Sequence, residues 1–135
     1  MKENSFKEKI ALVKIKDNDQ PFGSFFGVKK FPVAFILDVS IDLLNVKSDY
    51  QYYIEMKVNS ESRISNPSSY EKVPFSIPQE DMIFVKDNLG QSFITGKIGL
   101  IVDKSDSCAV EINLLDTNQK LLSSHSTYFY FGERE

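Results

Sequence analysis

The sequence contains few of the residues from which catalytic and metal sites are built. Its 135 residues include one cysteine, one histidine and no tryptophan. Because Cys108 is alone, no intramolecular disulfide can form, and Cys108 with His125 falls short of the Cys and His ligand set of a structural zinc site. No glycine pair is followed by the Lys-Ser/Thr ending of a phosphate-binding loop. We therefore expect no catalytic residue, no metal ligand and no cofactor.

Positive charge is also scarce. Lys and Arg number 16 against 19 Asp and Glu, which gives a net charge of -3. A nucleic-acid-binding domain needs a basic surface to displace counterions from phosphates, so this balance argues against that class. The segment 1–9 is too charged to open a signal peptide, and no apolar run approaches the length that spans a membrane. We expect a cytoplasmic protein with no nucleic-acid or membrane partner.

The overall composition is that of an ordinary globular protein. Hydrophobic residues make up 41% and charged residues 26% of the chain. A chain of this length buries about two-thirds of its unfolded surface without help from a metal or disulfide. We therefore expect a single domain over residues 1–135.

The clearest predicted element is a β-hairpin over residues 107–131. The turn formers of 116–119 separate two strands, and a four-residue loop places Leu114 opposite Leu121 and Val110 opposite His125. A two-residue turn at Asn118-Gln119 is the alternative, and it moves each partner by two positions without changing the faces. In both registers one face carries the apolar residues Cys108, Val110, Ile112 and Leu114.

Two further segments alternate with period two, the pattern of a half-buried strand. Residues 31–43 place apolar side chains at odd positions, and residues 50–58 place them at even positions. The connection over 45–49 has a length suited to a hairpin between them.

Three other segments predict strands less directly. Residues 9–16 favour a strand over a short capped helix, because they are rich in β-branched residues. Residues 22–28 predict a short glycine-containing strand. Residues 93–103 predict a strand with a bend or bulge at Gly96 or Gly99.

The middle of the chain contains a long polar loop and an edge. Residues 59–72 form the loop, and we expect high mobility over 60–69. Residues 73–78 predict an edge strand or extended arm, because Pro74 and Pro78 cannot donate to a central ladder. Residues 78–89 fit a short helix and a short strand equally well.

Together these elements predict an all-β fold. About seven or eight strands without helix–strand alternation indicate an antiparallel sandwich or barrel. The segments 11–13, 26–28 and 31–33, with a Phe-Pro entry into a long strand, resemble a bacterial immunoglobulin-like β-sandwich family of unknown function. The resemblance covers about the first third of the chain. It implies an immunoglobulin-like sandwich and carries no catalytic residues.

Tyrosines are the most suggestive candidates for function. Tyr53 falls on the polar face of its strand, and Tyr128 and Tyr130 fall on the face opposite His125. Exposed tyrosines are favoured in protein interfaces. The leading hypothesis is a non-enzymatic module that binds a protein partner or itself through this face, or through the edge strand at Val73 and Phe75.

Two other functions stay open. A calcium-assisted, small-ligand or carbohydrate-binding module would use the loop 59–72 and turn aspartates. These are Asp17, Asp19, Asp87, Asp103, Asp106 and Asp116. An enzyme would depend on Cys108 and His125, predicted to share a face about one cross-strand pair apart. A buried, inert thiol explains Cys108 more simply.

Overall fold

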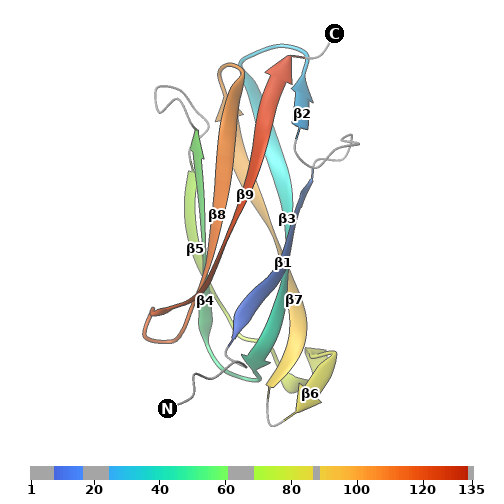
Figure 1. Cartoon of the computed structure of the whole chain (residues 1–135), viewed down its shortest axis with the longest axis vertical. Coiled ribbons are helices and arrows are strands. Elements are labelled where there is room, and N and C mark those ends of the chain that lie inside the picture. Colours follow the sequence, from blue (N-terminus) through green and yellow to red (C-terminus); the bar gives the residue numbers. More distant parts are fainter. Residues whose placement is uncertain (1–7, 17–24, 61–68, 87–88, 134–135) are drawn as a thin grey trace.

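The computed structural model describes residues 8–16, 25–60, 69–86 and 89–133, and these form an all-β sandwich of two sheets (Figure 1). The four-stranded sheet has the order β1-β3-β7-β6. Its strands are β1 (Lys9–Lys16), β3 (Val33–Lys47), β7 (Leu89–Val102) and β6 (Phe84–Lys86). The five-stranded sheet has the order β2-β9-β8-β4-β5. Its strands are β2 (Phe25–Val28), β9 (Leu121–Glu133), β8 (Asp106–Leu115), β4 (Tyr52–Ser60) and β5 (Ser69–Phe75).

The core lies between the inner faces of the two sheets, where period-two alternation predicted it. Odd positions of β3 and even positions of β4, β7 and β8 are buried there. Among the least exposed of these side chains are Leu37, Val39, Ile41, Leu43, Tyr52, Val58, Val102, Val110, Ile112 and Leu114. The described part of the chain contains nine strands, slightly more than predicted, and β2 pairs in parallel with β9 although every pair was expected to be antiparallel.

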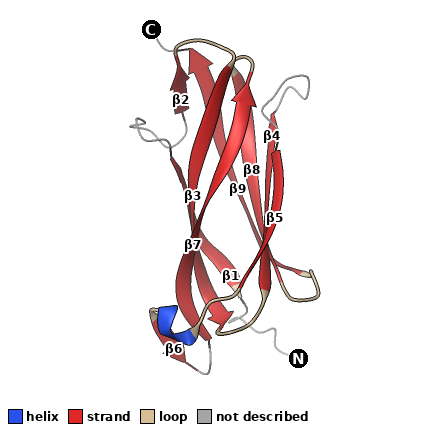
Figure 2. Ribbon diagram, turned by 180° about the vertical axis from the view of Figure 1, so that it is seen from behind, coloured by secondary structure: helices blue, strands red, loops and turns tan. Residues whose placement is uncertain are grey.

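The predicted hairpin between β3 and β4 is wrong. β3 pairs with β1 and β7, whereas β4 pairs with β5 and β8, so the segment between them crosses from one sheet to the other (Figure 2). Asn45, near the end of β3, and Asp49, in the crossover, adopt positive φ angles of 61° and 54°. Two strands with apolar faces can meet across a core as well as side by side, and alternation alone does not distinguish these arrangements.

The hairpin of β8 and β9 is confirmed, but in the alternative register. Ile112 lies opposite His125, and Val110 lies opposite Thr127. The turn places Leu115 opposite Leu121, one position beyond the predicted Lys120, and the register shift between Leu114 and Leu115 adds the second position. The inner face is unchanged by this shift, as period two requires.

The predictions for glycine and for the polar loop need correction. No bulge occurs at Gly96 or Gly99, because the β3–β7 register runs without a shift from Val33↔Val102 to Leu43↔Ser92. The loop predicted over 59–72 is shorter, since β4 extends to Ser60 and β5 begins at Ser69. Residues 61–68, where most of the mobility was predicted, lie outside the described residues.

The segment after β5 combines both predicted alternatives. A 3-10 helix, η1, covers Gln79–Asp81, and β6 follows it. β5 is an edge strand, as Pro74 predicted. Among the described residues no helix is long and apolar enough to cross a membrane.

Candidate functional site on the five-stranded sheet

The outer face of the five-stranded sheet carries all three predicted tyrosines, but not as one patch. Tyr53 on β4 lies opposite Leu115 of β8, whereas Tyr128 on β9 lies opposite Ala109 of β8. The two β8 positions are separated by roughly 20 Å along the strand. Tyr53 and Tyr128 therefore belong to opposite ends of the sheet.

Tyr53 is partly covered by its neighbours. The Lys72 ammonium lies 5.7 Å from the centroid of its ring, and its hydroxyl accepts a hydrogen bond of 2.8 Å from Gln51. The turn after β8 contacts the same neighbours, because Thr117 donates to the Gln51 carbonyl at 2.7 Å and Lys72 donates to Gln119. Tyr53 is therefore engaged within the molecule, which makes it a weak candidate for binding a partner.

Tyr128 and Tyr130 are the exposed pair. Their side chains are 70% and 41% exposed. Phe129 and Phe131 alternate with them and are buried, with their rings edge-to-face at 5.3 Å. Buried phenylalanines thus anchor the strand end that presents the tyrosines.

The two edge-strand candidates differ in their placement. The ring of Phe75 stacks on buried Tyr52, with centroids 5.6 Å apart, and packs against the core. Phe75 thus shares the inner face with Tyr52, which makes it a weaker candidate for contact with a partner than the exposed tyrosines. Val73 is 43% exposed but lies opposite buried Ile54, on the core side of the edge strand.

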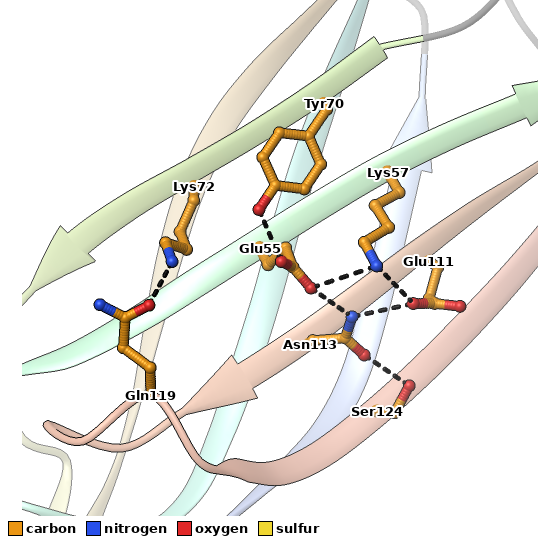
Figure 3. Close-up of polar contacts among 8 residues, drawn as sticks. All are labelled: Glu55, Lys57, Tyr70, Lys72, Glu111, Asn113, Gln119 and Ser124. Carbon is orange, nitrogen blue, oxygen red and sulfur yellow. Dashed lines mark hydrogen bonds and ion pairs between the residues drawn. The ribbon is translucent and has the colours of Figure 1, made fainter.

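A polar network that the sequence analysis missed occupies the centre of the outer face (Figure 3). The Asn113 amide donates to Glu55 and to Glu111, at 2.8 Å each, while its carbonyl accepts from Ser124 at 2.7 Å. Tyr70 also donates to Glu55, at 2.7 Å. Asn113 is only 6% exposed, so a polar residue within an otherwise apolar strand was the available signal.

Hydrogen bonding shifts the acid–base behaviour of this network. Donation from Tyr70, and then from Asn113, lowers the pKa of the Glu55 carboxyl below its usual value. The same contact with Glu55 raises the pKa of Tyr70. Both shifts favour a carboxylate on Glu55 and a protonated hydroxyl on Tyr70, which is the pairing that the hydrogen bond requires.

Lys57 joins the network through the same two carboxylates. Lys57 lies 3.6 Å from Glu55 and 3.8 Å from Glu111, so it shares both carboxylates with Asn113. The Lys57 side chain is 40% exposed, as is usual for an ion pair at a sheet surface. The arrangement is therefore suited to an ion-pair network.

The predicted closeness of Cys108 and His125 is wrong. Cys108 lies opposite Phe129, and His125 lies opposite Ile112, four positions further along β8. This corresponds to roughly 13 Å along the strand. Cys108 is 3% exposed, and burial, with a smaller contribution from Asp106, raises the pKa of its thiol to about 12. These surroundings are those of an inert buried thiol.

Two of the described turn aspartates, Asp106 and Asp116, take part in local hydrogen bonds. The Asp116 carboxylate accepts from the backbone of Asn118 at 2.8 Å and of Lys120 at 2.9 Å, and Asp106 accepts from the Ser107 backbone at 2.8 Å. Asp17, Asp19 and Asp87 lie outside the described residues. Within the described ranges no group of acidic, His or Cys side chains is arranged to hold a metal ion. The calcium-assisted alternative therefore stays a prediction from sequence.

A shallow groove lies on the other sheet. Its volume is about 540 Å³ and it runs across β1, β3 and β7. The polar side chains that line it are Lys14, Asp38, Ser40, Thr95 and Lys97. Lys97 and Asp38 form an ion pair of 3.2 Å across it. The groove is remote from the tyrosines, because it belongs to the opposite sheet.

Comparison with known proteins identifies similar folds but no family. No protein-family model and no curated protein matches the chain. An adhesin from Mobiluncus mulieris, described as containing intramolecular disulfide, isopeptide and ester bond cross-links, has a TM-score of 0.66 at 10% identity. The match covers 95% of this chain and 58% of the adhesin chain.

Two glycosidases also contain a similar fold. A putative β-galactosidase from Bacteroides fragilis has a TM-score of 0.59 at 12% identity, over 90% of this chain and 17% of that chain. A β-glucuronidase from Bacteroides uniformis has a TM-score of 0.58 at 7% identity, over 90% of this chain and 14% of that chain. At such low identities the likeness concerns the fold alone. The chain thus has the all-β sandwich fold that also occurs within these larger bacterial proteins.

Proposed function

We propose that this chain is a non-enzymatic, immunoglobulin-like module that binds a protein partner through Tyr128 and Tyr130 at one end of the five-stranded sheet. The exposure of these two tyrosines, beside a strand end anchored by buried phenylalanines, is the observation that carries the proposal. Tyr side chains combine apolar area with a hydrogen-bonding hydroxyl at low entropic cost, which suits an interface anchor.

The remainder of the outer face supports this choice of surface. Tyr53 is engaged by Lys72 and Gln51, and the central network satisfies its own carboxylates through Asn113 and Tyr70. Similarity to an adhesin domain is compatible with a binding role. The proposal keeps the expected cytoplasmic location, which cell fractionation tests.

The experiment uses a double variant that carries both Tyr128→Ser and Tyr130→Ser. Quantitative affinity capture from the native host compares this variant with wild type. We expect a specific partner whose recovery falls at least about tenfold in the double variant, since anchor residues contribute roughly 2 kcal/mol or more each. Tyr70→Ser is the matched control, because Tyr70 is a 57% exposed tyrosine on the same sheet but outside the patch. Equal recovery by wild type and the double variant would refute the proposal.

A further inference from the structure

The edge of β7 that faces away from β3 offers a second interaction surface. β7 pairs with β3 along its whole length, but β6 pairs only with Leu89–Gln91 (Figure 2). Along residues 93–102 of β7, no described strand pairs with the edge that faces away from β3. An unpaired row of backbone donors and acceptors can recruit another strand.

The hydrogen-bond pattern identifies which residues face this open edge. The Gln91 carbonyl accepts a bond of 2.8 Å from the Ile83 backbone, so the backbone of Gln91 faces the β6 side. Backbone groups alternate between the two edges of a strand. The residues that present N–H and C=O groups to the open edge are therefore Phe93, Thr95, Lys97, Gly99 and Ile101.

Other edges of the sandwich are better protected. β5 contains Pro74 and the charged pair Glu71-Lys72, which oppose strand addition. On β1, the Ile10 N–H donates to the Ser123 hydroxyl of β9 at 3.0 Å, so part of that edge is occupied. In contrast, residues 93–102 contain no proline and one charged residue, Lys97, which is paired with Asp38.

We propose that β7 pairs with β7 of a second copy of this chain, in antiparallel orientation, joining the two four-stranded sheets into one continuous sheet. The segment itself favours this occupant. Its inner-face positions are apolar, and a symmetric register exists that places Lys97 opposite Gly99 of the second copy. That register avoids the like-charge pair that Lys97 opposite Lys97 would create. The space beside Gly99 is open on this face, since a Cβ built there would meet no atom within 4 Å.

This inference goes beyond the proposed function, and it does not depend on the tyrosines. Tyr128 and Tyr130 lie on the other sheet. The double tyrosine variant should therefore form the same dimer as wild type. Failure of one proposal leaves the other unaffected.

Two variants that place opposite charges at Gly99 test the register. Sedimentation velocity across a range of concentrations measures the dissociation constant of the dimer for each variant. We expect Gly99→Lys to raise this constant at least about tenfold, because it faces Lys97 of the second copy, and Gly99→Glu to lower it. Equal constants for the two variants, or a wild type that remains monomeric at every concentration, would overturn the proposal.

The backbone contact is tested with a second pair of variants. Thr95→Pro removes an N–H that faces the open edge, and Thr95→Ala removes the same side chain but keeps that N–H. We expect only the proline variant to weaken the dimer, and thermal unfolding checks that both monomers fold. Amide exchange gives an independent readout in the wild type. The amides of Thr95, Lys97 and Gly99 should become protected on dimerisation, and continued rapid exchange in the dimer would contradict strand pairing.

Discussion

At the scale of single residues, Tyr52 connects parts of the chain that are distant in sequence. Its ring is fully buried, and its hydroxyl accepts a bond of 2.8 Å from the Lys47 backbone and donates one of 3.0 Å to Glu8. Burial raises the pKa of this hydroxyl, which keeps it protonated as a donor. Tyr52 thereby connects the residue before β1 to the end of β3.

We expect Tyr52→Phe to lower the free energy of unfolding by about 1–3 kcal/mol, because it leaves the Lys47 N–H without its acceptor. Urea denaturation monitored by circular dichroism measures the change. Tyr53→Phe is the control, since it removes a hydroxyl with an exposed partner and should change the free energy by less than about 0.5 kcal/mol. Equal losses in the two variants would show that the Tyr52 hydroxyl has no special role.

Alternation predicted the faces of individual tyrosines but not their exposure. Tyr53 and Tyr128 were both expected on the outer face, and both lie there. Only the structure distinguishes them, because the turn after β8 folds over Tyr53 through Gln119 and Lys72. Contacts between residues so far apart in sequence are not encoded in local periodicity.

At the scale of strands, the network around Glu55 links three neighbours in the five-stranded sheet. Tyr70 belongs to β5, Glu55 to β4 and Asn113 to β8. Asn113 separates the carboxylates of Glu55 and Glu111 while donating to both. The network therefore couples the register of these strands to the ionisation of Glu55.

This coupling predicts a pH dependence. Because the pKa of Glu55 is lower in the folded than in the unfolded protein, the carboxylate stabilises the fold above its unfolded pKa. That stabilisation is lost as the pH falls through the lowered folded pKa. We expect the melting temperature of wild type to exceed that of Glu55→Gln near neutral pH, and the difference to shrink as the pH falls below the ordinary glutamate pKa of 4.5.

The control for this titration is Glu80→Gln, which removes an exposed carboxylate from η1, outside the network. Its difference from wild type should stay small across the same range. A difference between wild type and Glu55→Gln that is constant with pH would contradict the role assigned to the Glu55 carboxylate.

Strand positions were predicted well, and strand partners poorly. The bounds of β1 match the predicted segment 9–16, and the inner face of β8 is as expected. The β8–β9 register depended on the shift at Leu114, and the β3–β4 connection depended on a change of sheet after Lys47. Both involve pairing partners elsewhere in the chain, which period-two patterns do not specify.

At the scale of the whole molecule, the sandwich is closed by packing between the two sheets. Gly96 of β7 faces the core, and a Cβ built on it would lie 3.8 Å from the terminal methyl of Met56 on β4. This is an ordinary van der Waals distance, so the two sheets leave room for one methyl group at this position. Gly99 on the same strand faces outward, with nothing within 4 Å.

We therefore expect Gly96→Ala to raise the free energy of unfolding by roughly 0.5–1 kcal/mol, since alanine reduces the freedom of the unfolded chain and adds a contact with Met56. Gly99→Ala is the matched control, because it shares the entropic effect but makes no contact between the sheets. Denaturation at a concentration low enough to keep the chain monomeric measures both. A smaller gain at Gly96 than at Gly99 would mean that the sheets must separate to admit the methyl group, and that inter-sheet packing at the centre of the sandwich is already complete.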